Sequence, residues 1–151
     1  MTGAALLDVN VLVALCNPGH VHHEIAHDWF ADHRESGSGW ATCPLTENGF
    51  LRVLGNPARS GEFVPLPRLV EHLRKWCAND DHQFWPDTLS LRDARLFNVS
   101  RLRGHKQIAD IYLLGLAVKR GGCLVTFDRR ISLGAVKAAR PDSLTVLTSL
   151  A

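Results

Sequence analysis

Short apolar segments alternate with longer segments of helical periodicity along the whole chain. The apolar segments are rich in branched residues, and AALL and CLVT are continuously apolar rather than alternating. Continuous apolar strands are typical of parallel sheets, because helices cover both faces of such a sheet. The pattern therefore predicts an α/β fold, with a central, mainly parallel five-stranded sheet in a three-layer α/β/α sandwich, as one domain over residues 1–151.

The predicted helices end where proline or glycine interrupts the period. Asn17-Pro18-Gly19, Gly55-Asn56-Pro57 and Gly121-Gly122 each follow the last turn of a helix. Strands are expected over residues 4–9, 39–43, 83–87, 123–127 and 144–147. Helices are expected over residues 11–16, 21–35, 44–54, 66–78, 91–100 and 106–120.

Composition narrows the class of protein. The 151 residues are 46% hydrophobic and 21% charged, which is ordinary for a globular domain. Acids or glycines cut the apolar runs well before the roughly 20 residues that a bilayer span needs. No basic segment precedes the first of these runs, and the four cysteines are scattered without a C-x-x-C pair. We therefore expect a soluble, cytoplasmic protein with reduced thiols, no cleaved signal and no membrane partner.

Four carboxylates occupy positions from which an apolar environment would normally exclude them. Asp8 and Asp128 each close an apolar strand, in LLDVNVL and LVTFDRR. Glu47 in LTENGF and Asp110 in IADIYLLGLA lie in the first turn of a predicted helix. Each acid alone has an ordinary explanation as a cap or first-turn residue. Because strand ends and the adjoining helix starts gather at one edge of a parallel sheet, we expect the four to meet there.

Clustered carboxylates repel one another and lose hydration, so a cation must compensate. No lysine is placed by the sequence to neutralise all four acids. Oxygen ligands suit Mg²⁺ or Mn²⁺, and the lack of a nearby cysteine or paired histidine in the sequence argues against Zn²⁺. Asn10 and Thr126, each two residues from an acid, can add a hydrogen bond or a water-mediated contact around the ion.

The order and spacing of the four acidic motifs resemble the PIN-domain ribonucleases. The chain length and the HVHHEIAHDWF segment are similar to the toxin branch of that family, the VapC proteins. The resemblance covers essentially the whole chain, and Ile111 stands where the family often has alanine, a difference expected to affect packing. It implies a PIN-like fold and a Mg²⁺- or Mn²⁺-dependent endoribonuclease of a toxin–antitoxin pair. Such toxins are usually homodimers and are held inactive by a cognate VapB-like antitoxin.

The same resemblance assigns roles to the acids. Asp8, Asp110 and Asp128 become metal ligands, directly or through water. Glu47 either completes the ligand set or orients the attacking water, and both roles stay open. A carboxylate-held ion suits the hydrolysis of RNA, because it can activate water and stabilise the charge that develops on a phosphodiester.

An acidic pocket repels RNA unless basic side chains draw the strand across it. Residues 91–151 carry 11 of the 17 Lys and Arg residues but only 4 of the 15 Asp and Glu residues. This asymmetry permits a polyanion on one side of the molecule, and single-stranded or looped RNA is expected. The candidate RNA contacts, several of them expected to be ordinary solvated charges, are Arg92, Arg95, Arg101, Arg103, Lys106, Arg129 and Arg130.

Three other functions fit single features of the chain. The HEIAH segment at residues 23–27 matches the H-E-x-x-H pattern of zinc proteases. Its helical period, however, places Val21 on the apolar face and both His23 and His27 on the solvent face. A phosphatase with an aspartyl nucleophile at Asp8 needs a second acid two residues later, where the chain has Asn10. A non-catalytic PIN-fold scaffold has no reason to retain four repelling acids.

Overall fold

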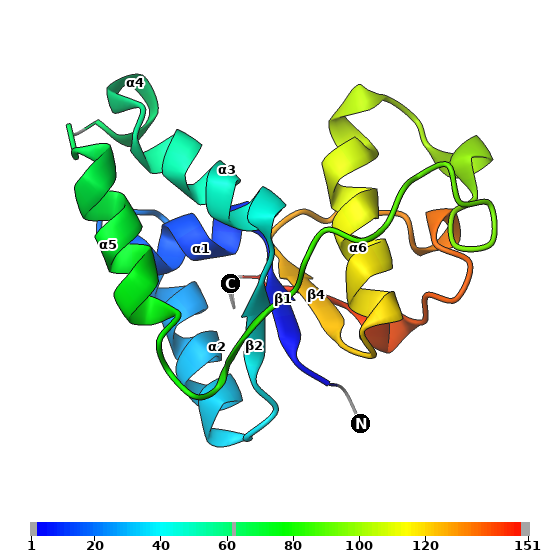
Figure 1. The fold of residues 1–151 in the computed structure, drawn as a ribbon, viewed down its shortest axis with the longest axis horizontal. Helices are drawn as coiled ribbons and strands as arrows, with labels where there is room; N and C mark the ends of the chain where they lie inside the picture. The colour runs from blue at the N-terminus through cyan, green and yellow to red at the C-terminus, as the bar shows by residue number, and fades with distance from the viewer. Residues whose placement is uncertain (1–2, 62, 149–151) are drawn as a thin grey trace.

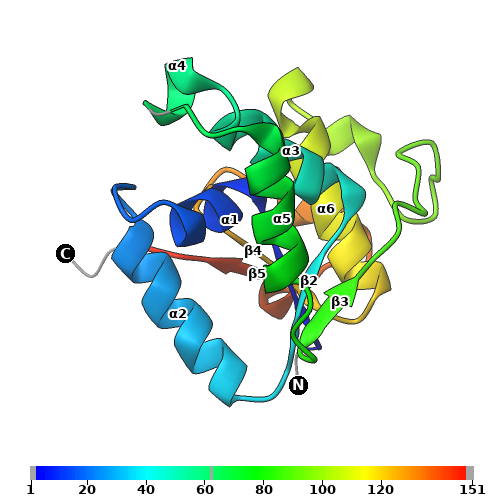
Figure 2. The same ribbon diagram turned by 60° about the vertical axis from the view of Figure 1, so that its left-hand side comes forward.

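A five-stranded, entirely parallel sheet forms the centre of the protein, in the order β3-β2-β1-β4-β5. The computed structural model describes residues 3–61 and 63–148. In Figure 2, β3 lies at the outer edge of the sheet beside β2. The strands are β1 (Ala5–Leu7), β2 (Trp40–Thr42), β3 (His82–Phe84), β4 (Cys123–Thr126) and β5 (Leu144–Val146).

Helices cover both faces of this sheet, which confirms the predicted three-layer α/β/α architecture (Figure 1). α6 (Ile108–Lys119) packs on one face. The helices on the other face are α1 (Val9–Cys16), α2 (His23–Glu35), α3 (Pro44–Leu54) and α5 (Leu66–Trp76), with the short α4 (Pro57–Ser60) following α3. The helices of the described residues fall short of the length and apolarity that a bilayer crossing requires.

The sheet separates two apolar cores, because successive residues of a strand point to opposite faces. In β1, Leu6 packs into the core beneath α6, while Leu7 packs into the core beneath α1 and α3. Leu124 and Val125 of β4 divide between the two cores in the same way. All four side chains are fully buried. Burial on both faces therefore explains why these strands are continuously apolar.

The strand pairing brings the ends of β1, β2 and β4 to one edge of the sheet. Leu6 pairs with Ala41 of β2, and Leu7 pairs with Val125 of β4. α1 begins directly after β1, and α3 begins shortly after β2. Gly49 lets these helices approach closely, since a Cβ atom at that position would lie 2.5 Å from a methyl carbon of Val9. This edge therefore carries the segments in which the predicted acids lie.

The predicted helix over residues 91–100 is wrong. The segment forms turns and ends in a short 3₁₀ helix, η1 (Val99–Arg101). Phe97 makes an isolated antiparallel bridge with Val136, so the backbone there pairs across the chain instead of coiling on itself. The Phe97 ring is buried against Gly115 of α6, where a Cβ atom would lie 2.4 Å from it. Tertiary packing thus overrides the local helical period.

The other predicted elements are present, with ends that differ from expectation by at most three residues. α3 has the predicted bounds, because Pro44 starts it and Gly55 caps it. α4 was not predicted. The described residues also form the 3₁₀ helices η2 (His105–Gln107), η3 (Leu133–Ala135) and η4 (Pro141–Ser143).

Candidate active site

Asp8 links β1 to α1 and is buried, with 6% of its surface exposed. It is the N-cap residue of α1, where its Oδ1 accepts a hydrogen bond from the Val9 N–H at 2.7 Å. Its Oδ2 accepts a second hydrogen bond, from the Thr126 hydroxyl, also at 2.7 Å. Burial raises the pKa of Asp8, the charge of Asp128 raises it further, and the two hydrogen bonds oppose this shift.

The Thr126 hydroxyl connects Asp8 to the loop that follows β4. Besides donating to Asp8, it accepts a hydrogen bond from the Asn10 amide at 3.3 Å and one from the Asp128 N–H at 3.1 Å. Asn10 Oδ1 in turn accepts from the Phe127 N–H at 3.3 Å. The network therefore holds the loop that carries Asp128 against the first turn of α1. Thr126 contacts Asp8 and the backbone of Asp128 directly, and Asn10 contacts Thr126 and the backbone of Phe127.

Asp110, in the first turn of α6, lies close enough to Asp8 and Asp128 to feel both charges. Burial raises the pKa of Asp110 to about 7, with further contributions from the two neighbouring carboxylates and from a shared hydrogen bond with Asp128. The pKa of Asp128 is lowered despite partial burial, because Arg130 and the Asp110 carboxyl group donate hydrogen bonds to it. The structure thus brings together three of the four predicted acids.

The described residues offer little positive charge to offset these three carboxylates. Among the described residues, neither Asp8 nor Asp110 forms a salt bridge with a lysine or arginine. Asp128 pairs with Arg130, whose Nε lies 3.3 Å from Oδ1, but the arginine side chain is 82% exposed. A solvent-exposed pair of this kind contributes only about 0–1 kcal/mol. Ionisation of all three carboxylates is therefore costly without a cation, and a bound cation would favour the ionised form of each.

We expect the metal-free protein to lose stability as the pH rises from about 4 to about 7. The folded-state pKa of Asp110, about 7, exceeds its ordinary value of 3.8, so the folded state binds a proton that the unfolded state releases. Asp110→Asn removes this loss of stability, because asparagine does not ionise. The variant should therefore melt a few degrees higher than the unmutated protein at pH 8 in EDTA, at about 2–4 °C for each kcal/mol gained.

At pH 5 the difference in Tm should be much smaller than at pH 8, because the loss of stability builds up between the ordinary pKa of 3.8 and the folded-state pKa of about 7. Thermal unfolding at the two pH values measures the difference. Asp142→Asn, at an exposed position where the carboxylate pairs with Arg140, provides the matched control and should show no such pH dependence. An equal Tm difference at pH 5 and pH 8 for Asp110→Asn would contradict this account.

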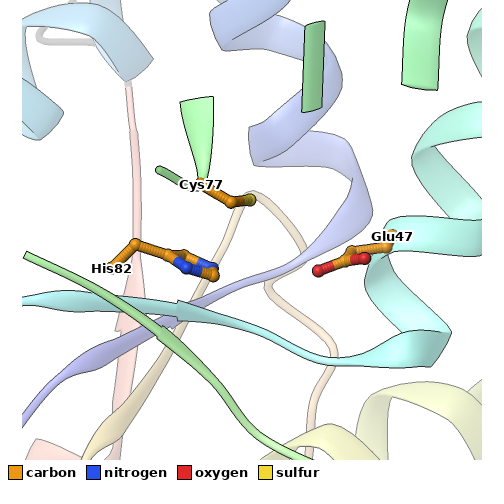
Figure 3. A group of neighbouring side chains, drawn as sticks. All are labelled: Glu47, Cys77 and His82. Carbon is orange, nitrogen blue, oxygen red and sulfur yellow. The ribbon is translucent and has the colours of Figure 1, made fainter. Parts of the chain in front are cut away.

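The carboxylate of Glu47 points to a different set of partners. Its Oε2 accepts a hydrogen bond from the Thr42 hydroxyl at 2.6 Å, and His82 Nε2 lies 2.8 Å from the same hydroxyl. The Glu47 carboxylate, the Cys77 thiol and the His82 imidazole offer ligand atoms that all lie within 4.8 Å of one another (Figure 3). The expectation that no cysteine or histidine lies near the acids is therefore wrong at Glu47.

The polar groups around Glu47 come from elements that are distant in sequence. Cys77 caps the end of α5, His82 begins β3 and Thr42 ends β2. Burial raises the pKa of the Cys77 thiol to about 11, and the Glu47 charge adds to this shift. Burial lowers the pKa of His82, with the nearby carboxylates of Glu47 and Asp81 opposing it. No spacing in the sequence signals this cluster, because it forms only when β2 and β3 pair.

Only some of the predicted RNA-binding residues adjoin the acids in the structure. Arg129 and Arg130 follow Asp128 directly and line an open hollow of about 470 Å³ with it. Lys106 lies in η2, immediately before the helix of Asp110. Elsewhere, Arg95 pairs with Asp93, Arg92 contacts Ser90, Arg101 lies in η1, and the Arg103 N–H donates to Gln107.

Two further arginines lie beside the site. Arg52 and Arg59 line a hollow of about 570 Å³ together with Val9 and Ala109, the chain neighbours of Asp8 and Asp110. They were not predicted from the sequence because they belong to its acid-rich part, and only the packing of α3 near α6 brings them to this edge.

The HEIAH segment lies on α2, outside the aspartate cluster. His27 is exposed, but His23 is half-buried, and its Nδ1 lies 2.7 Å from the carbonyl oxygen of Ala14. The expectation that both histidines face solvent is therefore wrong for His23. Val21, expected on the apolar face, is 84% exposed because α2 begins only at His23. Within residues 3–61 and 63–148, neither histidine belongs to a group of three metal-ligating side chains.

Comparison with known proteins agrees with the fold. The family model of the PIN domain matches residues 5–137. Ribonuclease VapC44 of Mycobacterium tuberculosis is 42% identical over 143 residues, which cover 95% of this chain and 99% of that protein. Ribonuclease VapC38 of the same organism is 43% identical over 145 residues, with coverage of 95% and 99%. Ribonuclease VapC39 is 38% identical over 128 residues, with coverage of 85% and 91%. The chain therefore belongs to the PIN domain family, as its four acidic motifs had indicated.

Proposed function

We propose that this protein is a metal-dependent endoribonuclease of the VapC toxin type. The observation that carries the proposal is the cluster of Asp8, Asp110 and Asp128. The Asp128 charge opposes ionisation of the other two acids, the Asp8 charge opposes that of Asp110, and among the described residues the one salt bridge to the cluster is that of the exposed Arg130. The ribonuclease names of relatives that align over most of the chain support the same activity.

The donor set fits a hard divalent cation. Three carboxylates, from the ends of β1 and β4 and from the start of α6, would supply oxygen ligands. Thr126, held by Asn10, fixes the positions of Asp8 and Asp128. Mg²⁺ or Mn²⁺ held by Asp8, Asp110 and Asp128, directly or through water, would activate water and offset the charge that develops on the phosphodiester. Asp110 must release its proton on binding, because the ligand is the carboxylate.

Glu47 is proposed as a further participant, either as a ligand or as the base that orients the attacking water. Its helix starts beside the strand end that carries Asp8, because β1 and β2 are neighbours in the sheet. In either role its carboxylate would leave the Thr42 hydroxyl, to which it is bound in the structure. The two roles differ in whether Glu47 changes the affinity for the ion or only the rate of cleavage.

The substrate we propose is single-stranded or looped RNA, drawn across the acids by the neighbouring basic residues. Arg129 and Arg130 are the best placed of these, because they line the hollow that also contains Asp128. A VapB-like antitoxin is the proposed inhibitory partner, and an arginine of that partner would complement the acidic cluster by charge. We propose a homodimer in the cell, by analogy with the family.

Cleavage of total cellular RNA by the purified protein tests the proposed function. We expect discrete new 5′ ends in Mg²⁺ or Mn²⁺ and none in EDTA, since without the ion nothing in the site offsets the charge that develops on the phosphodiester. Mapping the new ends by sequencing identifies the cleavage sites. Undiminished cleavage in EDTA would contradict the metal-dependent mechanism, and no cleavage in either ion would contradict the ribonuclease assignment.

A further inference from the structure

A second group of metal-ligating side chains lies around Glu47, apart from the three aspartates. Glu47 projects from the first turn of α3, Cys77 from the end of α5 and His82 from the start of β3, and the three point toward one another (Figure 3). We propose that Glu47, Cys77 and His82 bind a divalent cation of the Zn²⁺ class.

The donor types select this class of ion. A thiolate and an imidazole are preferred by Zn²⁺ and by chemically similar ions, whereas Mg²⁺ takes oxygen ligands and keeps most of its water. Tetrahedral Zn²⁺ with bonds of about 2.0–2.3 Å places its ligands about 3.3–3.8 Å apart. The three ligand atoms already lie within 4.8 Å of one another, so small side-chain rotations close the site. Water fills the remaining fourth position.

The surrounding structure holds two of the ligands in place before an ion arrives. Thr42 is fully buried, and its hydroxyl lies 2.6 Å from Glu47 Oε2 and 2.8 Å from His82 Nε2. The Trp40 ring packs edge-on against the His82 ring, with the ring centres 4.6 Å apart. Asp81 is engaged elsewhere, since its carboxylate accepts hydrogen bonds from Arg34 and Trp40. All three ligands are half-buried, so an ion can enter from solvent.

The proposed site has a consequence for RNA cleavage, and this consequence, unlike the site itself, rests on the proposed function. Glu47 cannot bind an ion beside Cys77 and act with the three aspartates at the same time. Occupancy by Zn²⁺ therefore withdraws Glu47 from RNA cleavage. The ion acts as an inhibitor of the Mg²⁺-supported reaction, at a place other than the aspartate cluster.

Cobalt substitution tests the site without reference to activity. Co²⁺ added to the reduced full-length protein should give the near-ultraviolet absorption band of a thiolate–cobalt bond. The band should be lost in Cys77→Ser and retained in Cys16→Ser, whose cysteine is also half-buried but lies at the end of α1. Zn²⁺ titration should displace the cobalt, and Cys77→Ser or His82→Ala should weaken Zn²⁺ binding at least about tenfold.

A missing band in the unmutated protein, or a band that persists in Cys77→Ser, would overturn the site and leave Thr42, Glu47 and His82 as a hydrogen-bonded network only. Binding by the histidines of α2 gives no thiolate band and is thereby excluded from the readout.

The effect of Zn²⁺ on cleavage is measured as the cleavage rate with Zn²⁺ divided by the same variant's rate without it. Inhibition that is equal in Cys77→Ser and Cys16→Ser overturns the link between the site and cleavage. Absence of all Mg²⁺-supported cleavage contradicts the proposed function, while the cobalt band still decides the site.

Discussion

Asp8→Asn should lower the rate of RNA cleavage by at least about 10³-fold. A metal ion contributes several kcal/mol to stabilising the transition state of phosphoryl transfer, and each 1.36 kcal/mol corresponds to a factor of ten in rate. Asn has nearly the same shape as Asp, and its amide oxygen can still accept the Thr126 hydrogen bond, so the fold should persist. The measurement is the single-turnover cleavage rate of a mapped RNA substrate in Mg²⁺ and in Mn²⁺.

The same variant should also lose the response of its melting temperature to Mg²⁺. An ion that binds only the folded state adds about 2.7 kcal/mol of stability at a concentration 100 times its Kd. The matched control is Asp142→Asn, an acid-to-amide change at an exposed position outside the site. Control and unmutated protein should cleave at the same rate and show the same Mg²⁺-dependent rise in Tm. A Tm rise in Asp8→Asn equal to that of the control would remove the metal assignment.

Thr126→Val should weaken the response to Mg²⁺ about 10–100-fold, which is the usual cost of losing a side chain that orients a metal ligand. Valine keeps the shape of threonine but removes the donor to Asp8 Oδ2 and the acceptor for the Asn10 amide and the Asp128 N–H. Both aspartates then lose a contact that holds them in position. The Mg²⁺ dependence of the cleavage rate measures the effect.

Thr126→Ser distinguishes orientation from packing. Serine keeps the hydroxyl and removes a methyl group from a fully buried position, so it perturbs the core without breaking the hydrogen-bond network. It should therefore require nearly the same Mg²⁺ concentration as threonine does. If serine and valine were equally defective, the hydroxyl would have no role in placing Asp8.

The fold could be predicted from local rules because the determining signals are local. Continuous apolar runs such as CLVT indicate strands that are buried on both faces, and the structure has them in a parallel sheet with a core on each side. Pro44 and Gly55 mark the ends of α3 correctly, since proline suits a first helical turn and glycine the residue after the last. The predicted helix over residues 91–100 failed because Phe97 bonds and packs with residues far along the chain.

The sequence by itself determined that Asp8, Asp110 and Asp128 would meet. Each stands at a strand end or a helix start, and in a parallel sheet those positions converge on one edge. Only the tertiary structure decided the partners of Glu47. Its side chain turns toward Thr42, because the pairing of β2 with β3 brings His82 and Cys77 to that side. A flexible carboxylate takes whichever polar partners surround it, and elements distant in sequence supply those partners here.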